Sequence, residues 1–487
     1  MKETADGGSL TCGREQNADS LAEDGKNIEI KRMIKENIMK SNAEISINNI
    51  YRLDGRVPLG KAIPFGLQHV LAMFVANLTP IVIVTAAAGL ETSQTAALIQ
   101  NAMFIAGVAT LIQLYPVWRI GAKLPIVMGV SFTFVTILSS VGAKYGYPAI
   151  LGAILIGGLV EGTLGLFAKY WRKLISPIVS ACVVTSIGFS LLTVGARSFG
   201  GGYSDSFGSA TNLLIGTVTL LSCILFNVFA KSFWKQLSVL FGLVVGYVLS
   251  IFLGVVDLSG LLDGGILSLP RILPFMPEFH AGAILSVVVI FLVSATETIG
   301  DTTAMVASGL DRDITEKEIS GSLACDGFAS SISSLFGCLP VTSFSQNVGL
   351  IAMTKVVNRF TIMTGAFCMI LSGLFPPIGA FFASLPDAVL GGCTIMMFGS
   401  IIISGVQMLA RAGFSQRNTI IGSLSLSVGI GFTLLPEIFQ IFPSIIQDVF
   451  AENCVAVVFV LAILLNLILP ENMDIEKAVE AQEYEVL

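Results

Sequence analysis

Charged side chains are scarce in this sequence. Only 12% of its 487 residues are Asp, Glu, Lys or Arg, whereas 54% are hydrophobic and the mean hydropathy is +0.83. A soluble globular domain carries about 25% charged residues. The deficit excludes a soluble globular enzyme and predicts an all-α polytopic membrane protein embedded in a lipid bilayer.

Residues that build catalytic and metal centres are scarce as well. The two histidines, His69 and His280, lie far apart, and the eight cysteines are scattered without a Cys-x-x-Cys pair. A metal centre, a disulfide framework and a membrane enzyme are therefore disfavoured, and we expect neither metal nor cofactor. The absence of a G-x-x-x-x-G-K-[ST] loop argues against an ATP-driven pump, and the absence of a basic stripe argues against a nucleic-acid partner.

Long apolar runs are what the sequence has instead. Fourteen of them are candidate transmembrane spans: 62–88, 95–117, 124–140, 149–168, 174–195, 211–230, 234–255, 281–308, 319–337, 340–355, 359–383, 388–410, 418–435 and 451–469. Spans 3 and 10 are short and rich in Gly, Ser and Thr, so we expect each to be part helix and part extended chain. A polar N-terminal tail, 1–60, has a possible amphipathic helix near Asn27–Asn42, and an acidic tail, 471–487, ends the chain.

The basic residues predict the orientation of these spans. With the N-terminus inside the cell, thirteen Lys and Arg residues fall in inner loops: Arg119, Lys123, Lys169, Arg172, Lys173, Lys231, Lys235, Arg312, Lys317, Lys355, Arg359, Arg411 and Arg417. The outer loops hold three, namely Lys144, Arg197 and Arg271. Because positively charged loops stay in the cytoplasm, this bias predicts a plasma-membrane protein with both termini cytoplasmic.

Fourteen spans divide into two halves of seven. An odd number of spans in each half places the second half upside down relative to the first, so we expect two inverted seven-span repeats. The first repeat would cover 61–256 and the second 281–470, joined by an extracellular loop at 257–280. Two short, interrupted spans at matching positions are where such a transporter is expected to bind its solute.

Polar residues gather in span 10, where contact with lipid would be costly. Thr342, Ser343, Ser345, Gln346 and Asn347 lie within six residues of one another. Each unpaired polar group in hydrocarbon costs several kcal/mol, so this segment must face protein or water. The amide of Gln346 presents one acceptor and two donors, which suits the C=O/N–H edge of a planar heterocycle. Asn347 could serve the same edge or brace the backbone.

Carboxyl groups occur at membrane depth just upstream. Glu297, in span 8, and Asp301, one turn later, share a helix face, and Asp326 lies in span 9. Intramembrane carboxyls are functional by default, and one that alternates between protonated and ionised forms could couple proton movement to solute binding. The alternative for Glu297 is a structural carboxyl that hydrogen-bonds neighbouring helices. Asp326 could either receive the proton or hold span 8 in place.

Span 3 supplies a candidate aromatic platform. Phe132, in Gly129-Val-Ser-Phe-Thr-Phe134, could stack on a flat ring, an interaction worth about 1–3 kcal/mol. If spans 3 and 10 meet at mid-membrane, Ser131 shares a cavity with Ser345. Helix N-termini there would then help to hold an electron-rich ring.

Two further polar residues lie in the first half of the chain. His69, in span 1, could relay protons or could be a neutral residue that hydrogen-bonds neighbouring helices. Glu161, in span 4, lies among glycines, and we interpret it as a structural residue or one near an interface.

These motifs resemble the nucleobase–ascorbate transporter family over about residues 57–470. The family signature of span 10 is Gln or Glu, Asn, one residue, Gly, four residues, Thr, then Arg, Lys or Gly. The sequence Gln346-Asn-Val-Gly-Leu-Ile-Ala-Met-Thr-Lys355 matches it at every position. Thr296-Glu-Thr-Ile-Gly-Asp301 is similar to the family's carboxylate motif, and Gly66-Leu-Gln-His-Val-Leu-Ala-Met73 is similar to its opening of span 1.

The resemblance implies fourteen spans in two inverted repeats, divided into a core and a gate domain, usually in a homodimer. It implies a proton symporter whose substrate is held by Glu297, by Gln346 with the Ser345 backbone, and by Phe132. Gln at the first signature position resembles xanthine and uric acid carriers, whereas Glu resembles uracil carriers. A uracil permease is the alternative. An anion exchanger of related architecture is a further alternative, but it would be expected to place a positive charge where spans 3 and 10 meet.

Overall fold

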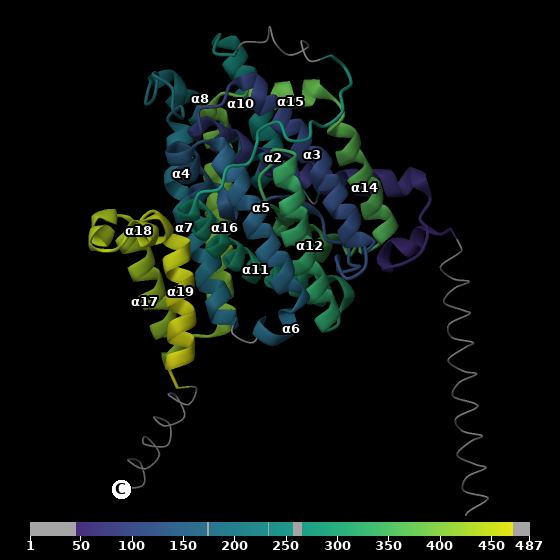
Figure 1. Cartoon of the computed structure of the whole chain (residues 1–487). Coiled ribbons are helices and arrows are strands. Elements are labelled where there is room, and N and C mark those ends of the chain that lie inside the picture. Colours follow the sequence, from purple (N-terminus) through teal and green to yellow (C-terminus); the bar gives the residue numbers. More distant parts are fainter. Residues whose placement is uncertain (1–44, 173–174, 232, 257–264, 471–487) are drawn as a thin grey trace, which may run out of the picture.

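The chain forms a helical bundle in which two short strands are buried at the centre. The structure is a computed structural model that describes residues 45–172, 175–231, 233–256 and 265–470. Figure 1 shows the C-terminal helices at one edge of the bundle and α14 at the opposite edge. The proposed amphipathic helix near Asn27–Asn42 and the acidic tail at 471–487 lie outside the described residues.

The first half of the chain supplies seven segments in order. They are α2 (Leu59–Ala87), α3 (Thr92–Leu114), β1 (Met128–Val130) with η2 (Phe132–Phe134) and α4 (Val135–Tyr145), α5 (Tyr147–Leu166), α7 (Pro177–Phe199), α8 (Ala210–Phe229) and α10 (Ser238–Phe252). Two single-turn helices, α6 (Ala168–Trp171) and α9 (Phe233–Gln236), lie in connections.

The second half repeats this order. It comprises α11 (Ala281–Leu310), α12 (Glu316–Leu335), β2 (Val341–Ser343) with α13 (Ser345–Thr354), α14 (Arg359–Ser372) with α15 (Pro376–Ala383), α16 (Asp387–Ala412), α17 (Gln416–Thr433), and α18 (Ser444–Phe450) with α19 (Cys454–Ile468). In each half the third segment is a strand followed by a short helix. Spans 3 and 10 are therefore short and partly extended, which confirms the expectation from the sequence.

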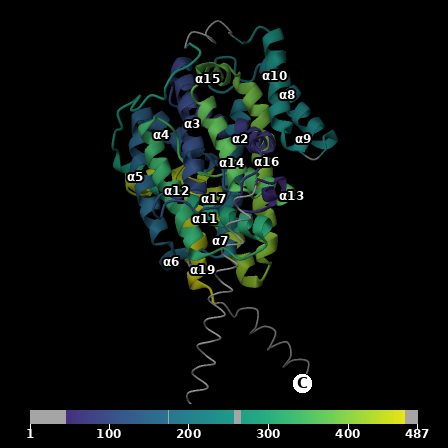
Figure 2. The same cartoon turned by 90° about the vertical axis from the view of Figure 1, so that its right-hand side faces the viewer.

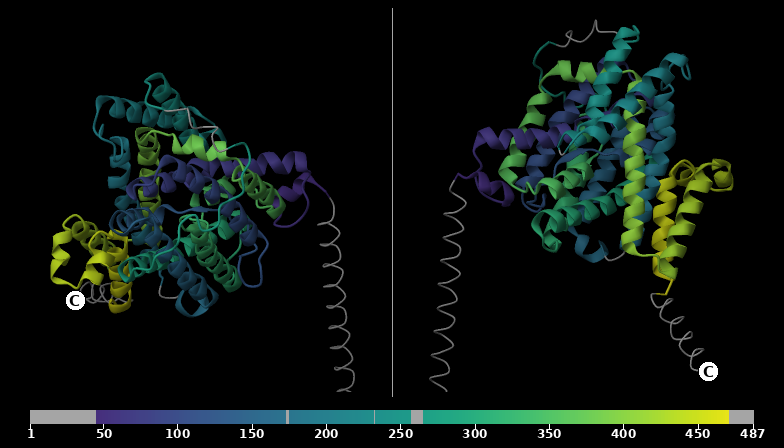
Figure 3. Two further views of the ribbon diagram at one scale, coloured as in Figure 1. Left: turned by 45° about the horizontal axis from the view of Figure 1, so that its top comes forward. Right: turned by 180° about the vertical axis from the view of Figure 1, so that it is seen from behind.

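Helix packing follows the same repeat. The fourth segment of the first half, α5, packs on the second segment of the other half, α12, and in the same way α14 and α15 of the second half pack on α3 of the first. A second group forms around the pair α7 and α16, with α8 and α10 on one side and α17 and α19 on the other. Figure 2 shows α8 and α10 at the side of the bundle away from α5, and Figure 3 shows the long yellow-green α16 beside the yellow C-terminal helices. We call this second group the gate and the remaining helices the core.

Seven described helices are long and apolar enough to cross a membrane. Two bent pairs, α14 with α15 at 78° and α18 with α19 at 94°, raise the number to nine if each pair is one span. The polytopic helical architecture is confirmed, whereas the count of fourteen and the domain boundaries at 61, 256, 281 and 470 stay predictions. The segments β1–α4 and β2–α13 are too short to qualify as long helices, because each is interrupted by a strand.

The two strands cross antiparallel in the core. Gly129 lies opposite Thr342, and the pairing is extended by hydrogen bonds from Ser131 N to Pro340 O and from Phe344 N to Val127 O, at 3.1 and 3.0 Å. These bonds satisfy backbone groups that lipid could not. Only glycine fits at 129, since a Cβ there would lie 2.5 Å from Met73 and 2.8 Å from the side chains of Asn77 and Phe344.

Residues 45–58, which the sequence assigned to the tail, pack on the first turn of α14. Arg359 forms an ion pair with Asp54, and its guanidinium also donates to Leu114 O at 2.7 Å. The side-chain amide of Asn358 donates at 3.0–3.1 Å to three backbone carbonyls, those of Asn49, Arg52 and Gly55. This segment therefore belongs structurally to the core.

Candidate functional site

The strand crossing brings the starts of two short helices together. β1 leads through Ser131 and Phe132 into α4, and β2 leads through Ser345 into α13. Because the strands are antiparallel, α4 and α13 leave the crossing in opposite directions. The candidate residues of spans 3 and 10 therefore meet, although they are more than 200 residues apart in the sequence.

Helix α11 runs past this crossing and contacts both sides of it. Thr133 Oγ1 donates a hydrogen bond of 2.6 Å to Glu297 Oε2. Ser345 Oγ donates to Asp301 at 2.8–2.9 Å, and Ser343 Oγ donates to Asp301 at 3.2 Å. Glu297 is thus anchored to the η2 end of span 3, whereas Asp301 holds the start of α13.

Asp326 links three elements and is completely buried. Its Oδ2 accepts hydrogen bonds from Thr298 Oγ1 of α11 and from the backbone N of Ser343 in β2. Its Oδ1 has no hydrogen-bond partner in the described part of the chain. The sequence allowed two roles for Asp326. The hydrogen bond from Thr298 shows that Asp326 holds span 8 in place. Its unpaired Oδ1 could in addition carry a proton.

Gln346 lies next to open space at the start of α13. Its side chain is exposed, and no hydrogen bond holds it within the part of the chain that the structure describes. Phe344, the N-cap residue of this helix, has no polar side chain to cap the first backbone N–H groups. Unpaired N–H groups at a helix N-terminus attract electron-rich ligand atoms. The amide of Gln346 and these N–H groups can therefore act on one ligand.

Phe132 lies where the core meets the gate. Its ring packs edge-on against Phe398 of α16, with centroids 5.3 Å apart, and the residue is 7% exposed. Ser131, 5% exposed, caps η2 by accepting a hydrogen bond from Thr133 N at 3.2 Å. A ligand that stacked on Phe132 would therefore have to separate it from Phe398, or approach its other face.

Asn347 and His69 face each other on the side away from the open space. Asn347 Nδ2 donates to His69 O at 3.1 Å and lies 3.3 Å from His69 Nδ1. Both residues are buried. In this structure Asn347 braces α13 against α2, the second of the two roles expected for it. His69 is a partner in that contact, and the hydrogen bonds found among the described residues do not join it to Glu297.

Exposed residues lead from the site to the end of the bundle that carries Lys355. On α13 they recur every three or four positions, namely Ser345, Gln346, Gly349, Ala352 and Met353. On the adjoining α11 they are Thr303, Ala304 and Ala307. A Cβ added at Gly300 or at Gly349 would meet nothing within 4 Å. The site is therefore open toward this end.

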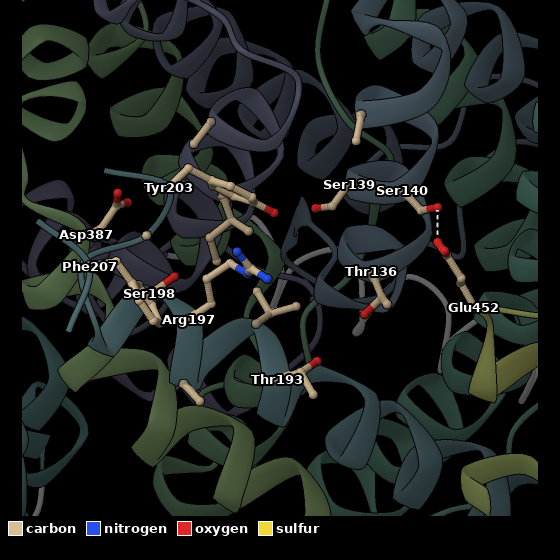
Figure 4. A pocket seen from close by; sticks show the side chains of 16 residues that line it. Thr136, Ser139, Ser140, Thr193, Arg197, Ser198, Tyr203, Phe207, Asp387 and Glu452 are labelled. Atoms are coloured by element: carbon tan, nitrogen blue, oxygen red, sulfur yellow. Dashed lines mark hydrogen bonds between the residues drawn. The ribbon is translucent and has the colours of Figure 1, made fainter. Parts of the chain in front are cut away.

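A separate pocket of about 550 Å³ lies between α2 and α4 of the core and α7 of the gate (Figure 4). Thr136, one turn after Phe132 on α4, contributes to its lining, together with Ser139. Arg197 lies over the ring of Tyr203 at 4.9 Å. The pocket thus continues along α4 toward the end of the bundle opposite Lys355.

The sequence did not single out Thr133 or Asn77, and it named Ser343 only as one of the polar residues of span 10. Thr133 stood in the segment that contains Phe132, but nothing in the sequence shows that it contacts Glu297, 164 residues away. Asn77 Oδ1 accepts a hydrogen bond of 2.7 Å from Val130 N and so fixes β1 to α2. A polar residue inside the long apolar run of α2 was the available signal.

The chain is similar in sequence to known membrane permeases. A sequence model described as "Permease family" matches residues 60–438. The chain is 33% identical over 441 residues to the putative purine permease CPE0397 of Clostridium perfringens, which covers 90% of this chain and 97% of that protein. It is 36% identical over 437 residues to the xanthine permease XanQ of Escherichia coli K12, which covers 86% and 94%.

A solved structure shares the fold. The murine anion transporter Slc26a9 superposes with a TM-score of 0.56 at 11% identity, over 84% of this chain and 69% of that chain. At this identity the likeness concerns the fold alone, which is that of a membrane transporter built from inverted repeats.

Proposed function

This chain belongs to the nucleobase–ascorbate transporter family, and on that premise we propose that it imports a purine nucleobase, xanthine or uric acid, across the plasma membrane together with protons. The family consists of permeases, so the protein is a transporter and not an enzyme. Both relatives described above are permeases whose names specify a purine or xanthine.

The observation that supports this proposal most directly is the convergence of complementary groups at the strand crossing. A purine such as xanthine is flat and carries alternating C=O and N–H groups along its edge. Gln346 offers a donor and an acceptor side by side, and Phe132 offers an aromatic ring. Glu297 offers a carboxylate that accepts ring N–H groups. No Lys or Arg among the described residues contributes a hydrogen bond or ion pair to these groups, which disfavours the anion-exchanger alternative.

Proton coupling is assigned to Glu297. Thr133 engages one of its carboxylate oxygens, and the residue is only partly buried beside the open space. Protonation of Glu297 would add a donor on the substrate side, so substrate affinity and proton occupancy would depend on each other. We further propose that both termini are cytoplasmic and that the protein is a homodimer.

Competition for uptake tests the substrate. Cells that lack endogenous purine carriers and express this protein should accumulate radiolabelled xanthine, and unlabelled xanthine or uric acid should compete more effectively than uracil, guanine or hypoxanthine. A protonophore should abolish the accumulation. Uptake competed best by uracil would favour the alternative permease, and accumulation insensitive to the protonophore would exclude proton coupling.

Gln346 is expected to set affinity and the choice of base. Gln346→Ala removes two hydrogen bonds from a ligand that is desolvated on binding, at a cost of about 1–3 kcal/mol, so the inhibition constant for xanthine should rise about 5- to 150-fold. Gln346→Glu should change the order of preference among bases, because the carboxylate cannot donate. Inhibition constants that stay at the wild-type values in both variants, across purines and uracil, would show that Gln346 does not contact the substrate.

Thiol labelling tests whether Ser131 and Ser345 share the substrate cavity. In a cysteine-depleted background, Ser345→Cys should react quickly with a small maleimide because position 345 is exposed, and Ser131→Cys should react more slowly because position 131 is buried. Saturating xanthine should protect both. Labelling that substrate leaves unaltered at both positions would place the site elsewhere.

A further inference from the structure

Glu161 is a buried carboxyl that the proposed mechanism does not use. It lies in the C-terminal third of α5 and is 1% exposed. Neither of its carboxylate oxygens has a hydrogen-bond partner among the residues that the structure describes. An isolated ionised carboxylate at such a position is very costly, so the group must share or hold a proton. The sequence alone suggested only a structural residue at this position.

Helix geometry shows where the side chain points. A Cβ at Gly157, one turn before Glu161, would meet Phe291 of α11, and a Cβ at Gly158 would meet Gly327 and Ser331 of α12. Residue 161 follows these two positions by four and three residues, so its direction falls between theirs. Glu161 therefore points into the seam between α11 and α12, where Thr298 and Asp326 are hydrogen-bonded.

The two helices that border Glu161 carry acidic groups. Glu297 lies on α11 and Asp326 on α12, and both helices pack on α5. Helix α4 also packs on α5, but its Lys144 lies in the last turn and pairs with Asp448 at 2.5 Å. Among the described residues, no cation forms a hydrogen bond or ion pair with Glu161.

Asp326 can carry a proton on Oδ1, the carboxylate oxygen that forms no hydrogen bond within the described residues. Its Oδ2 already accepts from Thr298 and from Ser343 N, whereas Oδ1 is unpaired. Two interacting carboxyls that hold one proton between them are stabilised relative to two ionised ones, and their titration belongs to the pair. One proton shared by Glu161 and Asp326 would engage Asp326 Oδ1 and one of the two unpaired oxygens of Glu161.

We propose that Glu161 is a second proton-holding carboxyl, located behind the substrate site, that exchanges its proton with Asp326 during transport. This inference rests on the proton symport proposed above. In the exchange the O–H bond of the Glu161 carboxyl breaks and an O–H bond forms at Asp326 Oδ1, so the total charge of the pair is constant. The Thr298 hydrogen bond ties Asp326 to α11, the helix that carries Glu297, and so links the pair to the substrate-facing carboxyl.

The seam allows such a carboxyl to stay enclosed. Around Glu161, α5 approaches α12 through glycines, and a Cβ at Gly327 would lie 2.1 Å from Gly162 N. Close approach of the backbones and the 1% exposure of Glu161 shield the carboxyl from bulk water on this side. The neighbouring carboxyls on α11 and α12 are therefore the proton-exchange partners that this packing favours.

Glu161→Gln tests the proposal, because glutamine keeps the shape and polarity of the side chain but carries no exchangeable proton. The purified protein is reconstituted in proteoliposomes, and two rates are measured with radiolabelled xanthine. The first is accumulation driven by an inward pH difference of about 2 units, which can support about 100-fold accumulation per coupled proton. The second is exchange of labelled for unlabelled xanthine at equal pH, which requires no net proton movement.

We expect Glu161→Gln to lower accumulation by about tenfold or more, to flatten its dependence on pH, and to leave exchange within about twofold of wild type. Glu161→Asp should restore part of the accumulation, because the shorter side chain can still hold a proton. The control Glu437→Gln alters an exposed carboxyl of the gate and should change neither rate.

Three results would overturn the proposal: wild-type accumulation in Glu161→Gln, an equal loss of accumulation and exchange per amount of reconstituted protein, or no recovery in Glu161→Asp. Failure of the proposed function looks different. If accumulation by the wild-type protein resisted a protonophore, proton symport itself would be wrong, whatever the behaviour of the Glu161 variants.

Discussion

Replacement of Glu297 by glutamine is expected to abolish accumulation of xanthine against a gradient, while the amount of protein in the membrane stays normal. Glutamine preserves the size of the side chain and can still accept the 2.6 Å hydrogen bond from Thr133. It cannot exchange a proton, so coupling is lost even where binding persists. Uptake should therefore reach about the external concentration and stop there.

Two companion variants make this prediction specific. Glu297→Asp keeps the titratable group but shortens it by one methylene, so partial accumulation should remain. Thr133→Val removes the hydrogen bond without changing the carboxyl, so affinity should fall while sensitivity to the protonophore is retained. If Glu297→Gln still accumulated xanthine with wild-type sensitivity to a protonophore, Glu297 would not be the coupling residue.

Gly327→Ala should strongly reduce the amount of folded protein. A Cβ at this position would lie 2.1 Å from Gly162 N and 2.6 Å from Gly158 O. These are backbone atoms, so α5 and α12 can accommodate the methyl group only by separating. Overpacking of this kind typically costs 1–3 kcal/mol and sometimes more. The amount of protein in the membrane and its melting temperature in detergent should both fall.

Gly431→Ala is the matched control. Position 431 lies in α17, and a Cβ there would meet nothing within 4 Å. Alanine is better than glycine inside a helix by about 0.5–1 kcal/mol, so this variant should be as stable as wild type or slightly more stable. Equal melting temperatures for Gly327→Ala and wild type would contradict the close packing of α5 on α12.

The helical architecture could be predicted from the sequence because a lipid bilayer constrains the composition and length of every segment that crosses it. A span must be apolar over a fixed length, and its backbone must be satisfied internally, so composition alone marks the helices. The same rule made spans 3 and 10 conspicuous, because Gly, Ser and Thr interrupt them. Strands β1 and β2 lie within these two spans. Their pairing could not be read from the residues, since register depends on what lies across the crossing.

The same distinction between sequence and tertiary structure applies to the candidate site. The sequence determined which polar residues form it, namely Glu297, Gln346 and Asp326, because polar groups at membrane depth are costly and are usually retained for function. Their partners were decided by the tertiary structure alone. Thr133 reaches Glu297 across 164 residues, Asn347 turns toward His69, and Glu161 points into the seam between α11 and α12 because these helices both pack on α5. Such contacts arise from packing between helices that are distant in the sequence. Each sequence segment by itself contains only one of the two partners of a contact.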